Sequence, residues 1–173
     1  MTAIYGASGA DGRQLAWPLL EQAVRLHWDW TALPPVERSP RGKPFFPGLA
    51  DRWFSLSHSG GLALCALSDA PVGVDIEVVR PRRASLPRRL LSPAELEGFD
   101  GTWEDFYHIW TLKESWCKRE DAPLYPPQRV EAPPPCPYKS YAGAGWWGAV
   151  CFHGAPPEGI IWLEVSCEKE GLI

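Results

Sequence analysis

The sequence predicts an α+β protein, in which two long helices accompany two groups of short strands. Residues 14–28 and 103–120 place apolar side chains at the spacing of an amphipathic helix. Residues 53–78 and 138–165 instead hold short apolar runs interrupted by turn residues. The order of helix followed by strands occurs twice, although the two halves share no recognisable sequence identity. Helices and strands that are grouped rather than strictly alternating are typical of the α+β class.

The composition suits a protein with a core and many loops. Hydrophobic residues make up 45% of the 173 residues, and the 19 prolines are roughly twice the usual share. The net charge of −4 does not favour nucleic-acid binding, and neither a secretory signal nor a membrane-length apolar run is visible. The five cysteines are odd in number and lack C-x-x-C spacing, so no zinc site is indicated. We therefore expect a cytoplasmic protein with no membrane or nucleic-acid partner.

Each element has its own local signal. A helix is predicted for residues 14–28, followed by a proline-rich connection. Short turns between the next three apolar runs suit antiparallel strands, and Ser92, with a proline after it and Glu95 at the third helical position, predicts a capped helix start. The run 103–120 lacks glycine and proline and is predicted as the longest helix. The predicted strands are 53–57, 62–67, 72–78, 138–143, 146–152 and 160–165.

Two carboxylates interrupt the apolar run that forms the third predicted strand. Because side chains alternate along a strand, Val74 and Ile76 share one face, while Gly73, Asp75 and Glu77 share the other. An exposed strand face with ordinary surface acids would show this pattern. So would a pair of oxygen ligands for a hard cation such as Mg²⁺, with the glycine leaving room for a bound group. The D-x-E pattern alone leaves both interpretations open.

A third carboxylate lies on the longest predicted helix. Glu114 is one turn from Trp110 and one turn from Lys118, so the three side chains share a face. A surface Glu–Lys pair is the simple interpretation, but the indole indicates a partly covered surface. With Lys113 on a neighbouring flank, this helix offers a carboxylate and two ammonium groups for a metal and the phosphates that it bridges.

The adjacent Ser57 and His58 do not form a nucleophile and its base, because neighbouring strand residues point to opposite faces. The chain also lacks the G-x-S-x-G turn of many hydrolases, which disfavours a hydrolase. His58 at the mouth of a turn is either a donor to a phosphate or a structural histidine.

Three segments taken together resemble a known family. "GKPFFPGLADRWFSLSHSGG", "PVGVDIE" and "FYHIWTLKESWCK" follow one another over about residues 42–118. They resemble the 4′-phosphopantetheinyl transferases of the surfactin-synthetase-activating type. The resemblance implies a fold of two α+β halves related by a pseudo-two-fold axis, with the active site between them. The halves would be residues 1–80, with the histidine and the D-x-E strand, and 81–173, with the W-x-x-K-E helix.

The resemblance also implies an activity and a set of site residues. The enzyme would transfer the 4′-phosphopantetheine arm of coenzyme A to a serine of an acyl or peptidyl carrier protein, leaving 3′,5′-ADP, in fatty-acid, polyketide or nonribosomal peptide biosynthesis. The reaction would depend on Mg²⁺, or Mn²⁺ in its place. The implied metal ligands are Asp75, Glu77 and Glu114; the implied catalytic residues are Asp75, Glu114 and Lys118; the implied coenzyme contacts are Arg13, Lys43, Pro44, Ser57, His58, Lys113 and Lys118.

A basic segment offers a docking surface for that carrier protein. Residues 80–89 contain five arginines and no acid, which is typical either of a solvated loop or of a patch that attracts an acidic partner. The predicted docking residues are Arg80, Arg82, Arg83, Leu86, Arg88 and Arg89. We expect a monomer.

The chain departs from the family pattern at two places. No basic helix precedes the predicted helix 14–28, and acids rather than a G-K-G-like loop follow Lys118. These departures leave an alternative, a catalytically weakened relative that binds coenzyme A or a carrier protein without turnover.

Overall fold

The protein is a mixture of helices and strands, which confirms the predicted α+β class. The computed structural model describes residues 1–166, apart from the side chain of Gln128. In chain order, the elements are β1 (Ala3–Ser8), α1 (Gly12–Trp28), β2 (Glu37–Arg38), β3 (Pro44–Phe45), β4 (Trp53–Ser59), β5 (Leu62–Ser68), β6 (Gly73–Val78), α2 (Leu86–Leu90), α3 (Pro93–Gly98), α4 (Trp103–Glu120), the 3₁₀ helix η1 (Pro127–Arg129), β7 (Tyr138–Gly143), β8 (Trp146–Cys151) and β9 (Ile160–Trp162).

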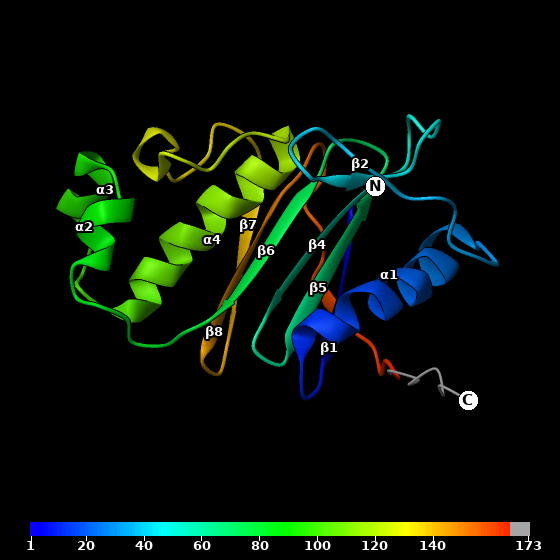
Figure 1. Ribbon diagram of the computed structural model, residues 1–173, viewed down its shortest axis with the longest axis horizontal. Coiled ribbons are helices and arrows are strands. Elements are labelled where there is room, and N and C mark those ends of the chain that lie inside the picture. The colour runs from blue at the N-terminus through cyan, green and yellow to red at the C-terminus, as the bar shows by residue number, and fades with distance from the viewer. Residues whose placement is uncertain (167–173) are drawn as a thin grey trace.

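The strands form two main sheets, each with a long helix packed on it. One sheet has the order β4-β5-β1-β9 and the other the order β6-β8-β7, while β2 and β3 form a small ribbon. All paired strands are antiparallel except β1 and β9. Figure 1 shows α1 and α4 on opposite sides of the molecule with the strands between them. Among residues 1–166, none of the helices combines the length and apolar composition that a bilayer crossing requires.

The predicted helices are confirmed, and their boundaries follow from capping. In α1, the Asp11 side chain accepts a hydrogen bond from the Arg13 N–H. In α3, the Ser92 side chain and Glu95 form the predicted reciprocal capping box. Thr102 caps α4, which ends at Asp121 in the left-handed conformation. Local side-chain chemistry thus fixes where these helices start.

The predicted strands exist, but one predicted pairing is wrong. β4 and β5 form the expected antiparallel hairpin, whereas β6 does not pair with β5. Both edges of β5 are already taken, by β4 and β1, so β6 pairs with β8 instead. The last strand is also shorter than predicted, at Ile160–Trp162. The prediction of a division after residue 80 stays a prediction, and each main sheet draws strands from both sides of that residue.

The alternation predicted for β6 is confirmed. Val74 and Ile76 are fully buried in an apolar cluster that joins the two main sheets, and Asp75 is on the opposite face. The predicted reason for the glycine is wrong. A Cβ at Gly73 would lie 2.0 Å from the carbonyl oxygen of Ser115 in α4, so the helix backbone, not a ligand, fills that space. The glycine allows α4 to approach β6 closely.

Candidate metal and coenzyme site

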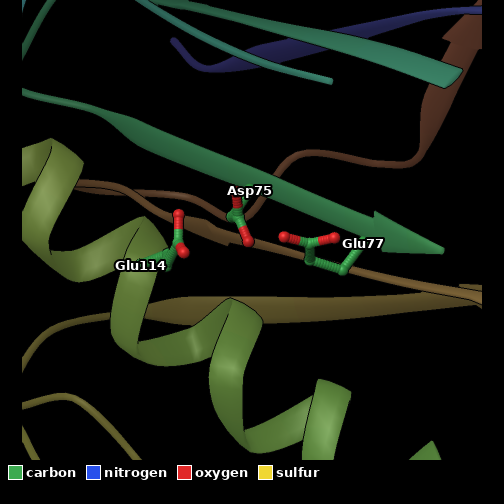
Figure 2. A group of neighbouring side chains, drawn as sticks. All are labelled: Asp75, Glu77 and Glu114. Carbon is green, nitrogen blue, oxygen red and sulfur yellow. The ribbon is translucent and has the colours of Figure 1, made fainter. Parts of the chain in front are cut away.

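Three carboxylates converge where α4 crosses β6. Asp75 and Glu77 project from β6 and Glu114 projects toward them from α4 (Figure 2). Each residue has an oxygen that lies within 4.8 Å of oxygens of the other two. The close approach at Gly73 and the alternation of the strand create this arrangement, because they bring α4 over the acidic face of β6. The structure therefore brings together the three predicted metal ligands.

Lys118 lies at the rim of this cluster and is tied to it. Its ammonium nitrogen is 2.6 Å from Oδ1 of Asp75 and 3.7 Å from Oε2 of Glu114, and it donates a 2.9 Å hydrogen bond to the Ser57 hydroxyl. Burial alone would lower the pKa of Lys118, but the neighbouring carboxylates, chiefly Asp75 and Glu114, outweigh it and raise the pKa. Lys118 thus remains a cation and partly offsets the negative charge of the cluster.

Two of the carboxylates, Glu114 and Glu77, hold protons more tightly than usual. Burial, followed by the charge of Asp75, raises the pKa of Glu114 to about 7. Burial also raises the pKa of Glu77, although the hydrogen bond from Ser59 opposes the shift. A group with a pKa near neutrality can both accept and release a proton under physiological conditions.

The cluster fits a hard divalent cation. Oδ2 of Asp75 is buried and has no hydrogen-bond partner among the residues that the structure describes, and leaving such an oxygen without a partner is costly. Three carboxylates supply oxygen ligands alone, which is the ligand set that Mg²⁺ and Mn²⁺ prefer. A cation at this place would satisfy the buried oxygen and reduce the repulsion that raises the pKa of Glu114.

A pocket of about 580 Å³ opens beside the cluster. Four of the predicted site residues, Lys43, Pro44, Glu114 and Lys118, line it, together with Arg41 and others. The ammonium of Lys43 donates to the carbonyl oxygens of Val72 and Arg119, the second at the end of α4. Burial lowers the pKa of Lys43 to about 8, against the opposing effect of Asp121 and Glu120. The pocket thus combines a partly buried lysine with the rim of the carboxylate cluster.

The other predicted coenzyme contacts do not line this pocket. Lys113 is fully buried, and its ammonium lies 2.5 Å from Oε2 of Glu95 and donates to the Leu90 carbonyl. Arg13 and His58 are exposed and are not among the residues that line the pocket. Ser57 is buried and donates to Asp75. Phosphate binding by Lys113 stays a prediction, and it would require the ion pair with Glu95 to open.

Two features of the site were not predicted from the sequence. Ser59 donates a 2.6 Å hydrogen bond to Oε2 of Glu77. The sequence pattern that could have predicted this contact is the strand alternation, which places Ser59 on the same face as Ser57. Arg41 donates to the carbonyl oxygen of Asp121, which ties the loop before Lys43 to the end of α4. That contact joins residues eighty apart and leaves no local pattern.

The predicted docking residues lie between β6 and the end of α2. All five arginine side chains are exposed. Leu86 is half-buried and packs against the apolar cluster of Leu91, Phe106 and Tyr107. Their order in the chain is Arg80, Arg82, Arg83, Leu86, Arg88 and Arg89. The structure therefore gives this basic segment access to solvent.

The sequence over the site matches one protein family. Residues 71–130, which include β6 and α4 with all three carboxylates, match the family model of the 4′-phosphopantetheinyl transferase superfamily. The resemblance inferred from the three motifs is thereby confirmed.

Individual relatives agree with the family match. The chain is 38% identical over 84 residues to the 4′-phosphopantetheinyl transferase Sfp of Bacillus subtilis (strain 168), which covers 46% of the chain and 38% of that protein. It is 39% identical over 83 residues to another 4′-phosphopantetheinyl transferase of Bacillus subtilis, covering 45% of the chain and 37% of that relative. It is 36% identical over 115 residues to the 4′-phosphopantetheinyl transferase AcpT of Salmonella typhimurium (strain LT2), covering 62% and 59%. The chain thus matches less than two thirds of the length of each.

Proposed function

We propose that this chain transfers the 4′-phosphopantetheine arm of coenzyme A to a serine of an acyl or peptidyl carrier protein. The observation that carries the proposal is the convergence of Asp75, Glu77 and Glu114 beside Lys118 at the edge of a pocket. Carboxylates and a lysine at one place suit a substrate with a pyrophosphate, because the metal and the ammonium group both offset its charge. The match of residues 71–130 to the transferase superfamily supports the same reaction.

The reaction exchanges one phosphorus–oxygen bond for another. The carrier serine oxygen bonds to the phosphorus next to the pantetheine arm, the pyrophosphate bond to that phosphorus breaks, and 3′,5′-ADP leaves. When bound by the three carboxylates, Mg²⁺ or Mn²⁺ would neutralise charge on the pyrophosphate and align it. Glu114 accepts the serine proton, because its carboxylate lies at the edge of the cluster and of the pocket. Lys118 screens the negative charge that collects on the departing 3′,5′-ADP.

The pocket beside the cluster is the proposed coenzyme site. Lys43 and Pro44 on its wall contact the adenine end in this proposal, and Lys118 contacts the phosphates. Arg13, His58, Ser57 and Lys113 are the remaining proposed contacts. Since Arg13 and His58 are exposed, they are accessible to the 3′-phosphate from outside the pocket.

We further propose that residues 1–80 and 81–173 are two pseudo-two-fold-related halves with the active site between them. The repeated packing of a helix on a sheet, α1 on the first and α4 on the second, supports an architecture of two related parts. Each proposed half also contributes one strand, β6 or β9, to the sheet formed mainly by the other half. We also propose that the protein is a monomer. The four described cysteines are all free, which suits the reducing cytoplasm.

The carrier protein is proposed to dock on the exposed arginines of residues 80–89. This segment follows β6 directly, so a partner bound there lies close to Glu77. Carrier domains that are acidic would be attracted by the arginines, mainly through faster association. The alternative, a relative that binds coenzyme A or a carrier without turnover, is favoured by one observation. Lys113, a proposed phosphate contact, is engaged with Glu95.

Mass spectrometry of a carrier protein tests the proposal. The chain is incubated with coenzyme A, Mg²⁺ and an apo-carrier, and the carrier is then weighed. We expect a mass increase equal to one phosphopantetheine arm, and no increase when EDTA is present. Unmodified carriers across several fatty-acid and peptide-synthetase types, with coenzyme A binding retained, would support the alternative and overturn the transferase.

Two variants test the assignment of the carboxylates. Asp75→Asn and Glu114→Gln each remove one anionic ligand while keeping the shape of the side chain. We expect each to lower the Mg²⁺-dependent rate at least about 100-fold. Mutating a residue that only hydrogen-bonds to a metal ligand typically lowers metal affinity or activity about 10- to 100-fold, and losing the ligand itself should have a larger effect. Glu21→Gln, an exposed position on α1, serves as the control. A near-wild-type rate in either site variant would contradict the three-carboxylate assignment.

A further inference from the structure

Three serines of β4 reach the edge of β6 that is not paired with β8. Ser55, Ser57 and Ser59 alternate along β4, so they share one face. The hydroxyl oxygen of each accepts a hydrogen bond from a backbone N–H of β6, at 3.0, 3.3 and 3.1 Å. We call these three residues the serine ladder. The ladder joins the two main sheets through side chains where backbone pairing is absent.

The serine ladder also fixes where the hydroxyl protons of Ser57 and Ser59 go. A serine hydroxyl has one hydrogen to donate and can accept in addition, and here each oxygen already accepts from an amide. Ser59 donates its hydrogen to Oε2 of Glu77 at 2.6 Å, and Ser57 donates to Oδ1 of Asp75 at 2.7 Å. No carboxylate stands opposite Ser55, because the corresponding residue of β6 is Gly73.

Glu77 depends on this contact more than the other two carboxylates do. Lys118 forms ion pairs with Asp75 and Glu114, whereas no ion pair to Glu77 exists among the residues that the structure describes. Glu77 lies near the end of β6 and is only half-buried. The hydrogen bond from the Ser59 hydroxyl therefore anchors the Glu77 carboxylate. Figure 2 shows this carboxylate directed toward Asp75.

The turn that follows Ser59 is hydrogen-bonded and closely packed. Ser59 ends β4, and the turn after it is held by 2.8 Å hydrogen bonds from the Gly12 N–H to the Gly60 carbonyl and from the Gly9 N–H to the Gly61 carbonyl. A Cβ at Gly61 would lie 2.2 Å from the Gly9 carbonyl oxygen, so the packing here is close. A hydroxyl on such a support can fix a carboxylate rather than follow it.

We propose that Ser59 is a positioning residue that holds Glu77 in place as a ligand of the divalent cation. The hydrogen bond occupies Oε2 and removes rotational freedom that Glu77 would otherwise lose on binding the cation. Ser59 does not touch the reacting atoms. This inference rests on the proposed function, since it assumes that the carboxylates bind a cation.

Titration with Mn²⁺ tests the proposal on the whole chain without coenzyme or carrier. Loss of the free-ion electron paramagnetic resonance signal gives the Mn²⁺ affinity directly. We expect Ser59→Ala to weaken Mn²⁺ binding about tenfold, equivalent to ~1.4 kcal/mol. Thermal unfolding, measured in parallel, reports the loss of the ladder bond to the Val78 amide separately.

Ser55→Ala is the matched control, because it loses the equivalent ladder bond to an amide but no contact with a carboxylate. Ser55 also lines the pocket, so the comparison uses Mn²⁺ affinity rather than turnover. We expect Mn²⁺ affinity in Ser55→Ala to stay within about twofold of wild type, with a similar fall in thermal stability.

A second pair keeps the test valid if Ser59→Ala unfolds. Ser59→Thr retains the hydroxyl, and Ser59→Val has the shape of threonine without the hydroxyl. Only Ser59→Val should therefore weaken Mn²⁺ binding. Equal affinities within this pair, or an equal loss in Ser55→Ala, would overturn the role of Ser59. Absence of Mn²⁺ binding by the wild-type chain would instead overturn the proposed metal site, so the two failures are distinguishable.

Discussion

The ammonium nitrogen of Lys118 lies 2.6 Å from Oδ1 of Asp75, an atom that belongs to the cluster proposed to bind a cation. This lysine provides part of the positive charge that three crowded carboxylates require. A divalent cation that binds the cluster as proposed would therefore compete with the lysine for Asp75, and a displaced Lys118 would become available to a phosphate.

This competition predicts opposite effects of one substitution on binding and turnover. In Lys118→Met, Mn²⁺ should bind severalfold more tightly, because the competing ammonium is gone, while transfer to the carrier should fall by about 100-fold or more. Mn²⁺ titration and the carrier mass assay measure the two quantities. Weaker Mn²⁺ binding in this variant would mean that Lys118 supports the cation site instead of competing with the cation.

The pKa of Glu114 predicts how stability depends on pH without divalent cations. Its folded-state pKa of about 7 lies above the usual 4.5, so the folded protein binds more protons than the unfolded chain between these values. The contribution of Glu114 to the free energy of unfolding is therefore fully present below pH 4.5 and is lost as pH rises through 7. Glu114→Gln should remove this loss, and Mg²⁺ should reduce it, in thermal unfolding across the range. Superimposable profiles for wild type and Glu114→Gln in EDTA would exclude the effect.

The buried pair of Lys113 and Glu95 predicts a structural role for this lysine. The side chains are 0% and 3% exposed, so Glu95→Gln, which leaves the ammonium without an anion, should cost ~3–5 kcal/mol of unfolding free energy. Glu97→Gln, exposed on the same helix, should change it by less than about 0.5 kcal/mol. Denaturant unfolding measures both.

Lys113→Met adds a test of phosphate binding to this comparison. If Lys113 is structural, the variant should lose stability while the coenzyme A affinity of the folded fraction is retained. A large loss of coenzyme A affinity with unchanged stability would instead support the phosphate contact that the family resemblance implies.

The close approach at Gly73 predicts a severe effect of one methyl group. Gly73→Ala would place a Cβ 2.0 Å from the Ser115 carbonyl oxygen and 2.4 Å from the Arg119 nitrogen. We expect a loss of at least about 3 kcal/mol in unfolding free energy, the upper end of overpacking, and weaker Mn²⁺ binding as α4 moves from β6. Gly98→Ala, with no atom near its Cβ, should be neutral or stabilising by up to about 1 kcal/mol. Equal stability of the two variants would contradict this packing.

The sequence was sufficient to predict a structural feature wherever residues close together in the chain determine it. Capping at Ser92 and the alternation around Asp75 both depend on near neighbours, and Glu114 was found because its motif spans a single helix. The pairing of β6 with β8 was not predictable in this way, since it depends on β5 having no free edge. The burial of Lys113 was not predictable for a similar reason. Its partner Glu95 lies on another helix, and the sequence around Glu95 indicates only a capping residue.

The strand pairing also determines when the site can exist during protein synthesis. β6 carries two of the three carboxylates but obtains its backbone partner only from β8, about seventy residues later, and β1 receives β9 later still. A nascent chain that has displayed Asp75, Glu77 and Glu114 outside the ribosome therefore still has an open strand edge beside them. Such edges slow folding and expose the chain to aggregation, so we expect the carboxylate cluster to be among the last parts of this protein to form.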